Sequence, residues 1–545
     1  MYFFGLALLV VALPLSKFLM SVSQFYLVGV FILDGIDREK VLDFFGERNR
    51  KSIILLIVPY SIAWAIEAVI RKFKRFFSSD NLPAVVFSSL YLLHILGLIH
   101  TVDFDYALKD LRIKLPILLL PLIFSTMPTL DRTQFRRLMM IFAGAVLVAT
   151  LISIYFLLSE PVADIREISK FISHIRFSLL ICIAIFILTY WILKQSVFNL
   201  KWKLVFLAVN TWFITYLIIV TSITGLVILI STGIVLLIVL VFQVTKSWWM
   251  KSLYLVFLVI IPITVISFVV SIVNDVYKVH PIDVDRLDKN TAKGNPYWHD
   301  LTNEQIENGY YVWLYINFDE MREAWNERSD MGFDGPDKRG QELRYTLVRF
   351  LTSKGYRKDA EGVHKLTDEE IALVEEGEAS ILYHERPQLY VRLYKIIWEY
   401  QQYQLSGNAS GHSVMQRFVY AQTAVSIIKE NPWLGVGTGD LNLAFHDKYK
   451  QMNTLLDEQF RWRSHNQFLA ISVGFGLVGL VWFLFSLLYP PIVTQRFSDY
   501  FYLSFFLVIL FSMFAEDTIE TQAGVTIFAF FSSLYLFAKK FHDSF

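Results

Sequence analysis

The sequence predicts an all-α polytopic membrane protein with about 12 transmembrane helices and one large, mainly helical domain between the late helices. Hydrophobic residues make up 55% of the 545 residues and charged residues only 18%, whereas soluble domains carry about 25% charged residues. Uncharged apolar runs such as residues 226–242 and 469–488 are long enough to cross a hydrocarbon layer about 30 Å thick as helices. The connector 274–465 has instead the composition of a soluble domain.

The predicted spans follow from the apolar runs between charged connectors. They lie near residues 2–15, 18–33, 83–100, 113–127, 138–158, 177–193, 204–220, 222–242, 252–274, 466–488, 498–515 and 523–538. The stretch 52–70 differs, because basic residues flank both of its ends and Pro59, Trp64 and Glu67 interrupt it. We expect an interfacial or re-entrant helix there.

These spans divide the chain into an N-terminal transmembrane bundle (1–274), a large loop domain (275–465) and C-terminal transmembrane helices (466–545). Lys and Arg in short loops mark the cytoplasmic side of a membrane. If the predicted spans alternate in direction, these residues share one side, and they include Arg71, Lys72, Lys74, Arg75, Arg132, Arg136, Arg137, Lys539 and Lys540. The loop domain then lies outside the cytoplasm. The net charge of +1 gives no basic field of the kind that binds nucleic acid.

The strongest candidate site lies where the loop domain ends. Arg461, Arg463 and His465 directly precede the predicted span 466–488. A helix N-terminus disfavours the imidazolium form, so we expect a neutral ring that can accept a proton. Arginine side chains are planar donors that suit phosphate oxygens. In an alternative interpretation, the two arginines hold the helix at the interface and His465 caps it.

A second candidate is Arg417, on a predicted amphipathic helix that leads into the glycine-rich residues 431–440. A nucleotide-binding loop is disfavoured, because no strand precedes these glycines and no helix of a βαβ unit follows them. We expect a tight turn that returns the helix towards the membrane. Arg417 could equally be a solvated or salt-bridged helix residue.

These segments together resemble a known signature. Arg417, Asn-Pro-Trp-Leu-Gly-Val-Gly-Thr-Gly at 431–439, Ser-His-Asn-Gln-Phe-Leu at 464–469 and Gly-Leu-Val-Gly-Leu at 476–480 are similar to the O-antigen ligase and polymerase superfamily. In that family a large periplasmic loop carries an Arg and a His, each tied to glycan transfer from undecaprenyl diphosphate. The resemblance implies a bacterial inner-membrane protein with a periplasmic loop. Residues 283–407 exceed the family's minimal loop.

The resemblance also bears on weaker candidates. Ligases of the family often show Ser-Arg-x-Gly late in the membrane region, where this chain has Thr-Ser-Ile-Thr-Gly at 221–225. Arg176, at the outer start of a predicted span, is therefore a candidate substitute, although a snorkelling arginine would also suit that place. The Asp-x-Asp pattern at 103–105 recurs at 283–285 and is weak evidence for a metal. The acidic residues 516–520 are expected to form a solvated turn, and the alternative is that they hold an acceptor hydroxyl or a basic partner.

The expected function is a metal-independent, inverting glycosyl transfer that needs no cofactor. His465 and Arg417 are the expected catalytic residues, and Arg176, Arg461 and Arg463 the expected diphosphate-binding residues. The expected partners are an undecaprenyl-diphosphate-linked glycan, a lipid A-core or other glycan acceptor, and membrane lipids. One alternative is a repeat-unit polymerase, which differs only in the acceptor, and another is a metal-dependent transferase. A non-catalytic polysaccharide transporter is disfavoured, because the spans contain almost no charged residues.

Overall fold

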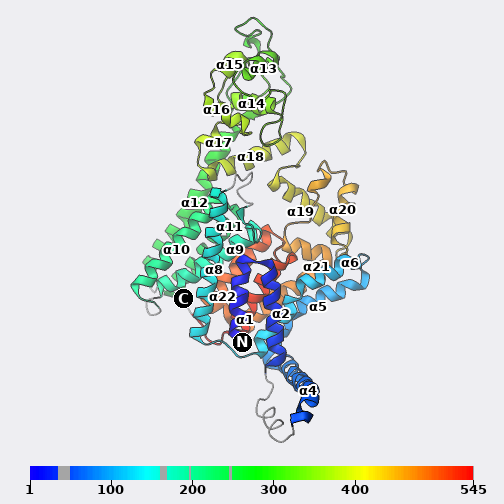
Figure 1. Ribbon diagram of the computed structural model, residues 1–545. Helices are drawn as coiled ribbons and strands as arrows, with labels where there is room; N and C mark the ends of the chain where they lie inside the picture. The colour runs from blue at the N-terminus through cyan, green and yellow to red at the C-terminus, as the bar shows by residue number, and fades with distance from the viewer. Residues whose placement is uncertain (35–49, 160–167, 195–197, 245–247, 544–545) are drawn as a thin grey trace. The chain divides into compact units, whose positions relative to one another are not determined.

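The computed structural model describes residues 1–34, 50–159, 168–194, 198–244 and 248–543, and its described residues are mainly helical (Figure 1). They form two compact units. The first contains residues 1–254 and 416–545, and the second contains residues 255–415. The three predicted domains were defined by membrane crossing rather than by contacts, so their boundaries stay predictions.

The first unit holds most of the described helices, both apolar and polar. They are α1 (Tyr2–Leu15), α2 (Lys17–Leu33), α4 (Arg50–Phe76), α5 (Leu82–Leu96), α6 (Phe104–Lys114), α7 (Pro116–Thr126), α8 (Arg132–Ser159), α9 (His174–Leu193), α10 (Leu200–Ile219), α11 (Ile223–Val244), α20 (Leu441–Gln451), α21 (Gln467–Val493), α22 (Tyr500–Ala515) and α23 (Gln522–Ser533). Helices α12 (Trp248–Tyr277) and α19 (Ser413–Glu430) have residues in both units. Short turns are η1 (Ser79–Asn81), η2 (Gly97–His100), η5 (Glu458–Phe460), η6 (Arg496–Ser498), η7 (Thr518–Glu520) and the π-helical η8 (Leu534–Ala538).

Six helical segments among the described residues are long and apolar enough to cross a membrane. They are Ser79–His100, Arg132–Ser159, His174–Leu193, Leu200–Ile219, Ile223–Gln243 and Gln467–Val493. Shorter apolar helices lie at Tyr2–Leu15, Lys17–Leu33, Pro262–Tyr277, Tyr500–Ala515 and Gln522–Ala538. The predicted class of helical membrane protein is confirmed, while the number of 12 spans and the side of the loop stay predictions.

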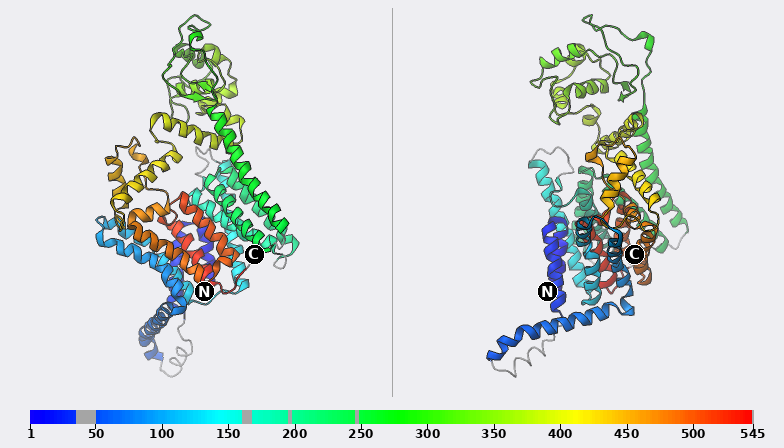
Figure 2. Two further views of the ribbon diagram at one scale, coloured as in Figure 1. Left: turned by 180° about the vertical axis from the view of Figure 1, so that it is seen from behind. Right: turned by 90° about the vertical axis from the view of Figure 1, so that its right-hand side faces the viewer.

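The core of the first unit surrounds α9 and α23, which are buried on nearly all sides. Helix α9 packs against α8, α10, α11 and α22, and α23 packs against α7 and α22. A helix that is apolar all round is stable only when other helices or lipid cover it. Helices α1 and α2 lie side by side at the edge of this core (Figures 1 and 2).

Helix α21 is interrupted at Gly476, whose φ of +63° lies in the left-handed region. The glycine-rich loop crosses this break. The Leu477 N–H donates to the Pro432 carbonyl at 2.8 Å, and the Gly437 N–H donates to the Gly474 carbonyl at 2.9 Å. A Cβ at Gly476 would lie 2.3 Å from backbone atoms of Trp433. Only glycine fits both the φ angle and this close approach.

The other end of the same loop is tied to the segment between α5 and α6. The Thr438 hydroxyl donates to the His94 carbonyl at 2.6 Å. The Asp440 carboxylate accepts the N–H groups of Val102 and Asp103 at 2.8–3.1 Å. The predicted tight turn therefore connects the end of α19 to α21 and to the start of α6. These hydrogen bonds fix the position of α19 and thus of Arg417.

The second unit is smaller and mixed in its local structure. It contains η4 (Val284–Arg286), the two-stranded antiparallel pair β1 (Ile306–Glu307) and β2 (Tyr310–Tyr311), and helices α13 (Phe318–Asn326), α14 (Leu343–Ser353), α15 (Ala360–His364), α16 (Asp368–Glu375), α17 (Leu382–Glu385) and α18 (Gln388–Ser406). Trp325, Phe350 and Leu351 are fully buried in its own hydrophobic core. Its helices agree with the predicted helical character of the loop.

Candidate functional site

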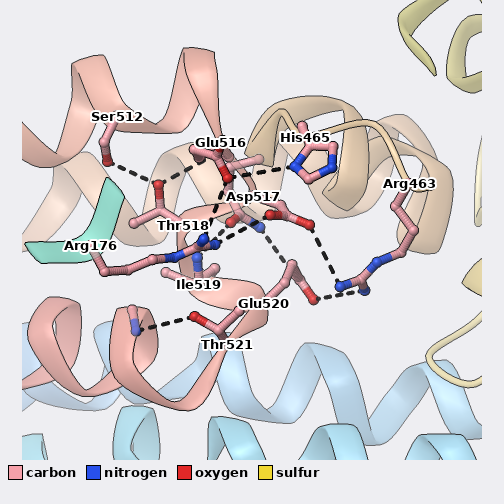
Figure 3. Close-up of polar contacts among 12 residues, drawn as sticks. Arg176, Arg463, His465, Ser512, Glu516, Asp517, Thr518, Ile519, Glu520 and Thr521 are labelled. Atoms are coloured by element: carbon pink, nitrogen blue, oxygen red, sulfur yellow. Dashed lines mark hydrogen bonds and ion pairs between the residues drawn. The ribbon is translucent and has the colours of Figure 1, made fainter. Parts of the chain in front are cut away.

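Four of the five predicted site residues meet around one short acidic segment, residues 516–520, between α22 and α23. Arg176 comes from the first turn of α9, Arg417 from α19, and Arg463 and His465 from the segment before α21. Figure 3 shows Arg176, Arg463 and His465 directed towards this segment. Residues from distant parts of the sequence thus form a single site within the first unit.

Glu516 is the centre of the site. Its Oε1 accepts a hydrogen bond of 2.5 Å from Arg417 Nη2, while its Oε2 lies 3.5 Å from Arg176 Nη1 and 3.5 Å from His465 Nδ1. Burial of Glu516 acts to raise its pKa, but the contact with His465 and the charges of Arg176 and Arg417 hold the pKa below its ordinary value. Glu516 is therefore a carboxylate at neutral pH.

The pKa of Asp517 is shifted in the opposite direction from that of Glu516. Its Oδ1 lies 3.5 Å from Arg176 Nη2 and its Oδ2 lies 3.5 Å from Arg463 Nη2. These contacts are at the limit of hydrogen bonding. Burial raises the pKa of Asp517 above its ordinary value, because the charges of Arg463, His465 and Arg176 offset the desolvation only in part.

Glu520 belongs to a buried network that holds the acidic segment in place. Lys114 Nζ donates to Glu520 Oε2 and to both Asp110 carboxylate oxygens, each at 2.7 Å. Gln467 Nε2 donates to Glu520 Oε1 at 2.9 Å. Burial acts to raise the pKa of Glu520, but the charges of Lys114 and Arg463 keep it well below its ordinary value. Every oxygen of this carboxylate is satisfied, so the segment is rigidly placed.

Arg463 links this network to the rest of the site. Its Nη1 donates to the Tyr106 hydroxyl at 2.9 Å and lies 3.7 Å from Glu520 Oε2. Burial acts to lower the pKa of Arg463, but the charges of Glu520 and Asp517 raise it above the ordinary value. Its guanidinium group is permanently charged.

His465 has an unusual backbone conformation. Its φ is +46°, a left-handed value that costs a residue other than glycine about 1 kcal/mol or more. Asn466 is the N-cap of α21, and its side chain accepts the Leu469 N–H at 3.0 Å. The alternative interpretation that His465 caps the helix is therefore wrong. The Tyr420 ring lies 5.6 Å from the imidazole ring, centroid to centroid, and helps to fix its orientation.

Arg461 lies apart from this group. Its Nε donates to the Leu456 carbonyl at 2.9 Å, and its Nη1 lies 3.7 Å from Glu458. It lines a neighbouring cavity of about 600 Å³, whose wall also includes Arg463 and Glu520. Its expected role in binding the diphosphate stays a prediction.

The wall of this cavity combines aromatic rings with polar side chains. It includes Tyr106, Trp462, Asp103, Asn442 and His446. Convergent hydrogen-bonding groups and aromatic faces are typical of small-molecule sites. Sugar hydroxyls and apolar ring faces match such a wall.

The donor set of a metal site is also present. Ligand atoms of His465, Glu516 and Asp517 lie within 4.8 Å of one another. Arg176 and Arg417 already contact Glu516, and Arg463 contacts Asp517. A divalent cation here would compete with these three arginines for the same two carboxylates. The expectation of a metal-independent site stays a prediction.

The favoured expectation for the acidic segment is wrong, and the alternative, that it holds basic partners, agrees with its contacts to three arginines. A solvated turn was expected, whereas Glu516, Asp517 and Glu520 are only 2%, 6% and 8% exposed. A signal was present, because several arginines predicted at one face of a membrane protein need counter-charges. These three are the acidic residues in the predicted connector between the last two spans.

Together, the apolar helices and the buried site of one imidazole and several arginines define a helical membrane protein with a charged site. Residues 378–484 match the family described as O-antigen ligase. The matched segment includes Arg417, the glycine-rich loop, Arg461, Arg463 and His465, so the predicted resemblance is confirmed. Family members have a ligase- or polymerase-type membrane function. No curated protein matches the chain.

Proposed function

We propose that this protein is a glycosyltransferase that moves a glycan from undecaprenyl diphosphate to an acceptor hydroxyl at the periplasmic face. The lipid A-core is the proposed acceptor, and the reaction needs no metal. One observation carries this proposal. A histidine and three arginines, drawn from three separate segments, meet on two buried carboxylates beside a polar and aromatic cavity of about 600 Å³.

The arginines form the diphosphate site. Arg176 and Arg463 contact the carboxylates at 3.5 Å, the limit of a hydrogen bond. Exchange of these contacts for hydrogen bonds to a diphosphate therefore costs little free energy. Guanidinium groups bind phosphate oxygens in pairs of hydrogen bonds. In the reaction they stabilise the charge that grows on the departing diphosphate. Removal of one well-placed donor costs roughly 3 kcal/mol in the barrier of comparable sites.

The charges within the site couple the binding of diphosphate to the uptake of a proton. Four cationic and four acidic side chains balance each other: Arg176, Arg417, Arg463 and Lys114 against Asp110, Glu516, Asp517 and Glu520. Bound diphosphate therefore adds excess negative charge. Protonation of Asp517 reduces this excess, and its raised pKa makes it the carboxyl group best suited to take up a proton.

His465 acts as the general base. Its Nδ1 lies 3.5 Å from Glu516 Oε2 and has no hydrogen-bond partner among the described residues. We propose that Nδ1–H donates to Glu516 in the substrate complex, so that Nε2 accepts the proton of the acceptor. Such contacts often shorten when substrate binds. The acceptor oxygen bonds to the anomeric carbon, and the bond from that carbon to the diphosphate breaks. The electron pair leaves with the diphosphate, the acceptor proton moves to Nε2, and a single displacement inverts the anomeric centre.

The cavity next to Arg463 provides room for a sugar. Tyr106 and Trp462 supply aromatic faces, while Asn442 and His446 supply hydrogen-bonding groups. Arg463 belongs both to this wall and to the arginine site. A sugar held there remains next to the bond that breaks.

The test is transfer by the purified protein of a labelled undecaprenyl-diphosphate glycan to lipid A-core. We expect transfer by the wild type that persists in EDTA. Arg417→Ala should slow transfer about 100-fold, whereas Lys429→Ala, which removes an exposed cation from the same helix, should not. Unchanged transfer in Arg417→Ala would contradict the proposal, and loss of transfer in EDTA would point to the metal site.

The polymerase alternative needs only a different acceptor. The same assay with a second lipid-linked glycan separates the two activities, because a polymerase joins the two glycans and leaves the lipid A-core unmodified. Movement of the glycan across a vesicle membrane with no transfer in either assay would instead indicate a transporter.

A further inference from the structure

A second charged cavity lies at the far end of the first unit from the candidate site. The acidic segment 516–520 precedes α23, whereas Lys540 follows η8 at the other end of the same apolar segment. Lys540 lines a cavity of about 460 Å³. The wall also includes Asp34, directly after α2, residues Arg71, Lys72 and Arg75 of α4, and residues 126–129 at the end of α7 and just after it. The proposed transfer reaction does not use this cavity.

The cavity is rich in positive charge. Four cations line it, Arg71, Lys72, Arg75 and Lys540, and Asp34 is the one acidic residue among the described residues of its wall. Arg71 Nη1 is paired with Glu67 Oε1 at 2.8 Å outside the wall, so Lys72, Arg75 and Lys540 are the cations that favour an anion. Lys72 Nζ lies 3.2 Å from the Asp34 carboxylate, so that single charge is already shared. The cavity therefore favours an anion.

Hydrogen bonds to backbone carbonyls position two of these cations, Lys72 and Arg75. Arg75 Nη1 donates to the Thr126 carbonyl at 3.1 Å, at the C-terminal end of α7. Lys72 Nζ donates to the Asp34 carbonyl at 2.7 Å. Lys72 is only 8% exposed, which holds its charge at the inner wall instead of in bulk solvent. The cations are thus preorganised rather than scattered on mobile side chains.

Helix α4 shows what kind of anion fits. Ile62, Ile66, Ile70 and Phe73 are each 42–54% exposed, and their spacing puts them on one stripe of the helix. Helix α4 runs crosswise to α1 and α2 at their ends (Figure 2). A helix with an exposed apolar stripe and basic neighbours lies in the membrane interface, with the stripe among the acyl chains. An anion that fills the cavity is therefore next to lipid tails.

We propose that this cavity binds the phosphate headgroup of an anionic phospholipid, whose acyl chains lie along the apolar stripe of α4. The lipid links α4 to the end of α7 and to the segment that contains Lys540. Basic residues close to an anionic membrane surface each contribute about 1 kcal/mol to such binding. A free phosphate ion would use the same cations but would have no use for the apolar stripe.

The test uses delipidated full-length protein in a neutral detergent. Native mass spectrometry measures binding of phosphatidylglycerol, of phosphatidylcholine and of inorganic phosphate. We expect tight binding of one phosphatidylglycerol. Arg75→Gln combined with Lys540→Gln should weaken it about 30-fold, the equivalent of about 2 kcal/mol for two cations. Lys74→Gln, which removes an exposed cation of the same helix that does not line the cavity, should leave the affinity within about twofold.

Three results would overturn the proposal. Equal binding of phosphatidylglycerol and phosphatidylcholine would remove the role of charge, and equal losses in Lys74→Gln and the double variant would indicate a diffuse surface effect. Binding of inorganic phosphate as tight as that of the lipid would make the occupant a free anion. If Arg75→Gln prevents folding, Lys540→Gln alone keeps the test, with an expected loss of about fivefold.

Discussion

Replacement of Glu516 by glutamine removes one carboxylate charge from the centre of the site and preserves the shape of the side chain. Glu516 contacts Arg417 at 2.5 Å and His465 Nδ1 at 3.5 Å. A hydrogen bond to a charged group contributes about 1.5–3 kcal/mol. The Arg417 side chain is 36% exposed, so solvent screens this pair, and we expect a stability loss near the lower limit, about 1.5 kcal/mol.

The effect of Glu516→Gln on activity separates two roles. If Glu516 orients His465, kcat falls about 100-fold, because a misoriented base loses much of the 10²–10⁴-fold that general-base catalysis supplies. If Glu516 only occupies the arginines until substrate arrives, its loss lowers the KM for the donor and leaves kcat unchanged. We expect the fall in kcat. The assay is initial transfer rate against donor concentration, with purified protein.

Asp517→Asn is the matched control for stability. The depressed pKa of Glu516 means that its charge stabilises the fold above the ordinary Glu pKa of about 4.3, and that this contribution is lost as pH falls through the lowered pKa. The raised pKa of Asp517 has the opposite sign, so its charge is unfavourable at pH 7. At pH 7, Glu516→Gln should lower Tm and Asp517→Asn should not. A lower Tm in Asp517→Asn alone would contradict the expected effects of the two charges on stability. An unchanged kcat in Glu516→Gln would contradict the role of Glu516 in orienting His465.

Three further predictions test other parts of the structure. His465→Asn should keep or raise Tm, because Asn tolerates the φ of +46° better, yet it should lower transfer by about 10²–10⁴; a large loss of Tm would contradict the proposed backbone strain. Gly435→Ala should lower thermal stability by an amount equivalent to about 2 kcal/mol, because the φ is +69° and the Cβ would lie 2.4 Å from the Gly474 backbone; an unchanged Tm would argue against the close packing of loop and helix. Glu520→Gln should lower the free energy of unfolding by about 3 kcal/mol, because it removes the charge of one of the two carboxylates that contact the buried Lys114. A chemical denaturation curve equal to that of the wild type would contradict this.

The sequence was sufficient to predict the helical membrane class, because an apolar run of about 20 residues has few stable alternatives to a membrane helix. It was less informative near residue 115. The run predicted as one span at 113–127 lies on two helices, α6 (Phe104–Lys114) and α7 (Pro116–Thr126). Pro116 is at the first position of α7, where its missing N–H does no harm and its ring ends the preceding helix. Proline at this position was the signal for the boundary.

The histidine and its nearby arginines could be located from sequence because they are close together in the chain and next to an apolar run. The sequence could suggest acidic partners for them, but not which carboxylate contacts which arginine. Glu516 contacts Arg417 across 99 positions in the chain, and Asp517 contacts Arg176 across 341. No local pattern encodes contacts of that range. A polar residue between two spans is ordinarily solvated, whereas the packing of α6, α21, α22 and α23 around this segment buries it.

The role of the glycine-rich loop was also only partly predictable. The glycines indicated a turn, but its partner is the break of α21 at Gly476. Such a pairing depends on which backbone groups of α21 are free. That information arises only when the two segments meet.

The central claim is that Arg176, Arg417 and Arg463 bind the diphosphate of the donor with the anomeric carbon in reach of His465. An electron cryo-microscopy structure with an undecaprenyl-diphosphate glycan analogue that resists transfer tests it most directly. We expect diphosphate oxygens within about 3.2 Å of at least two of these arginines, with the first sugar towards the cavity that contains Tyr106. A diphosphate bound away from all three arginines, or at the basic cavity of α4, would contradict it.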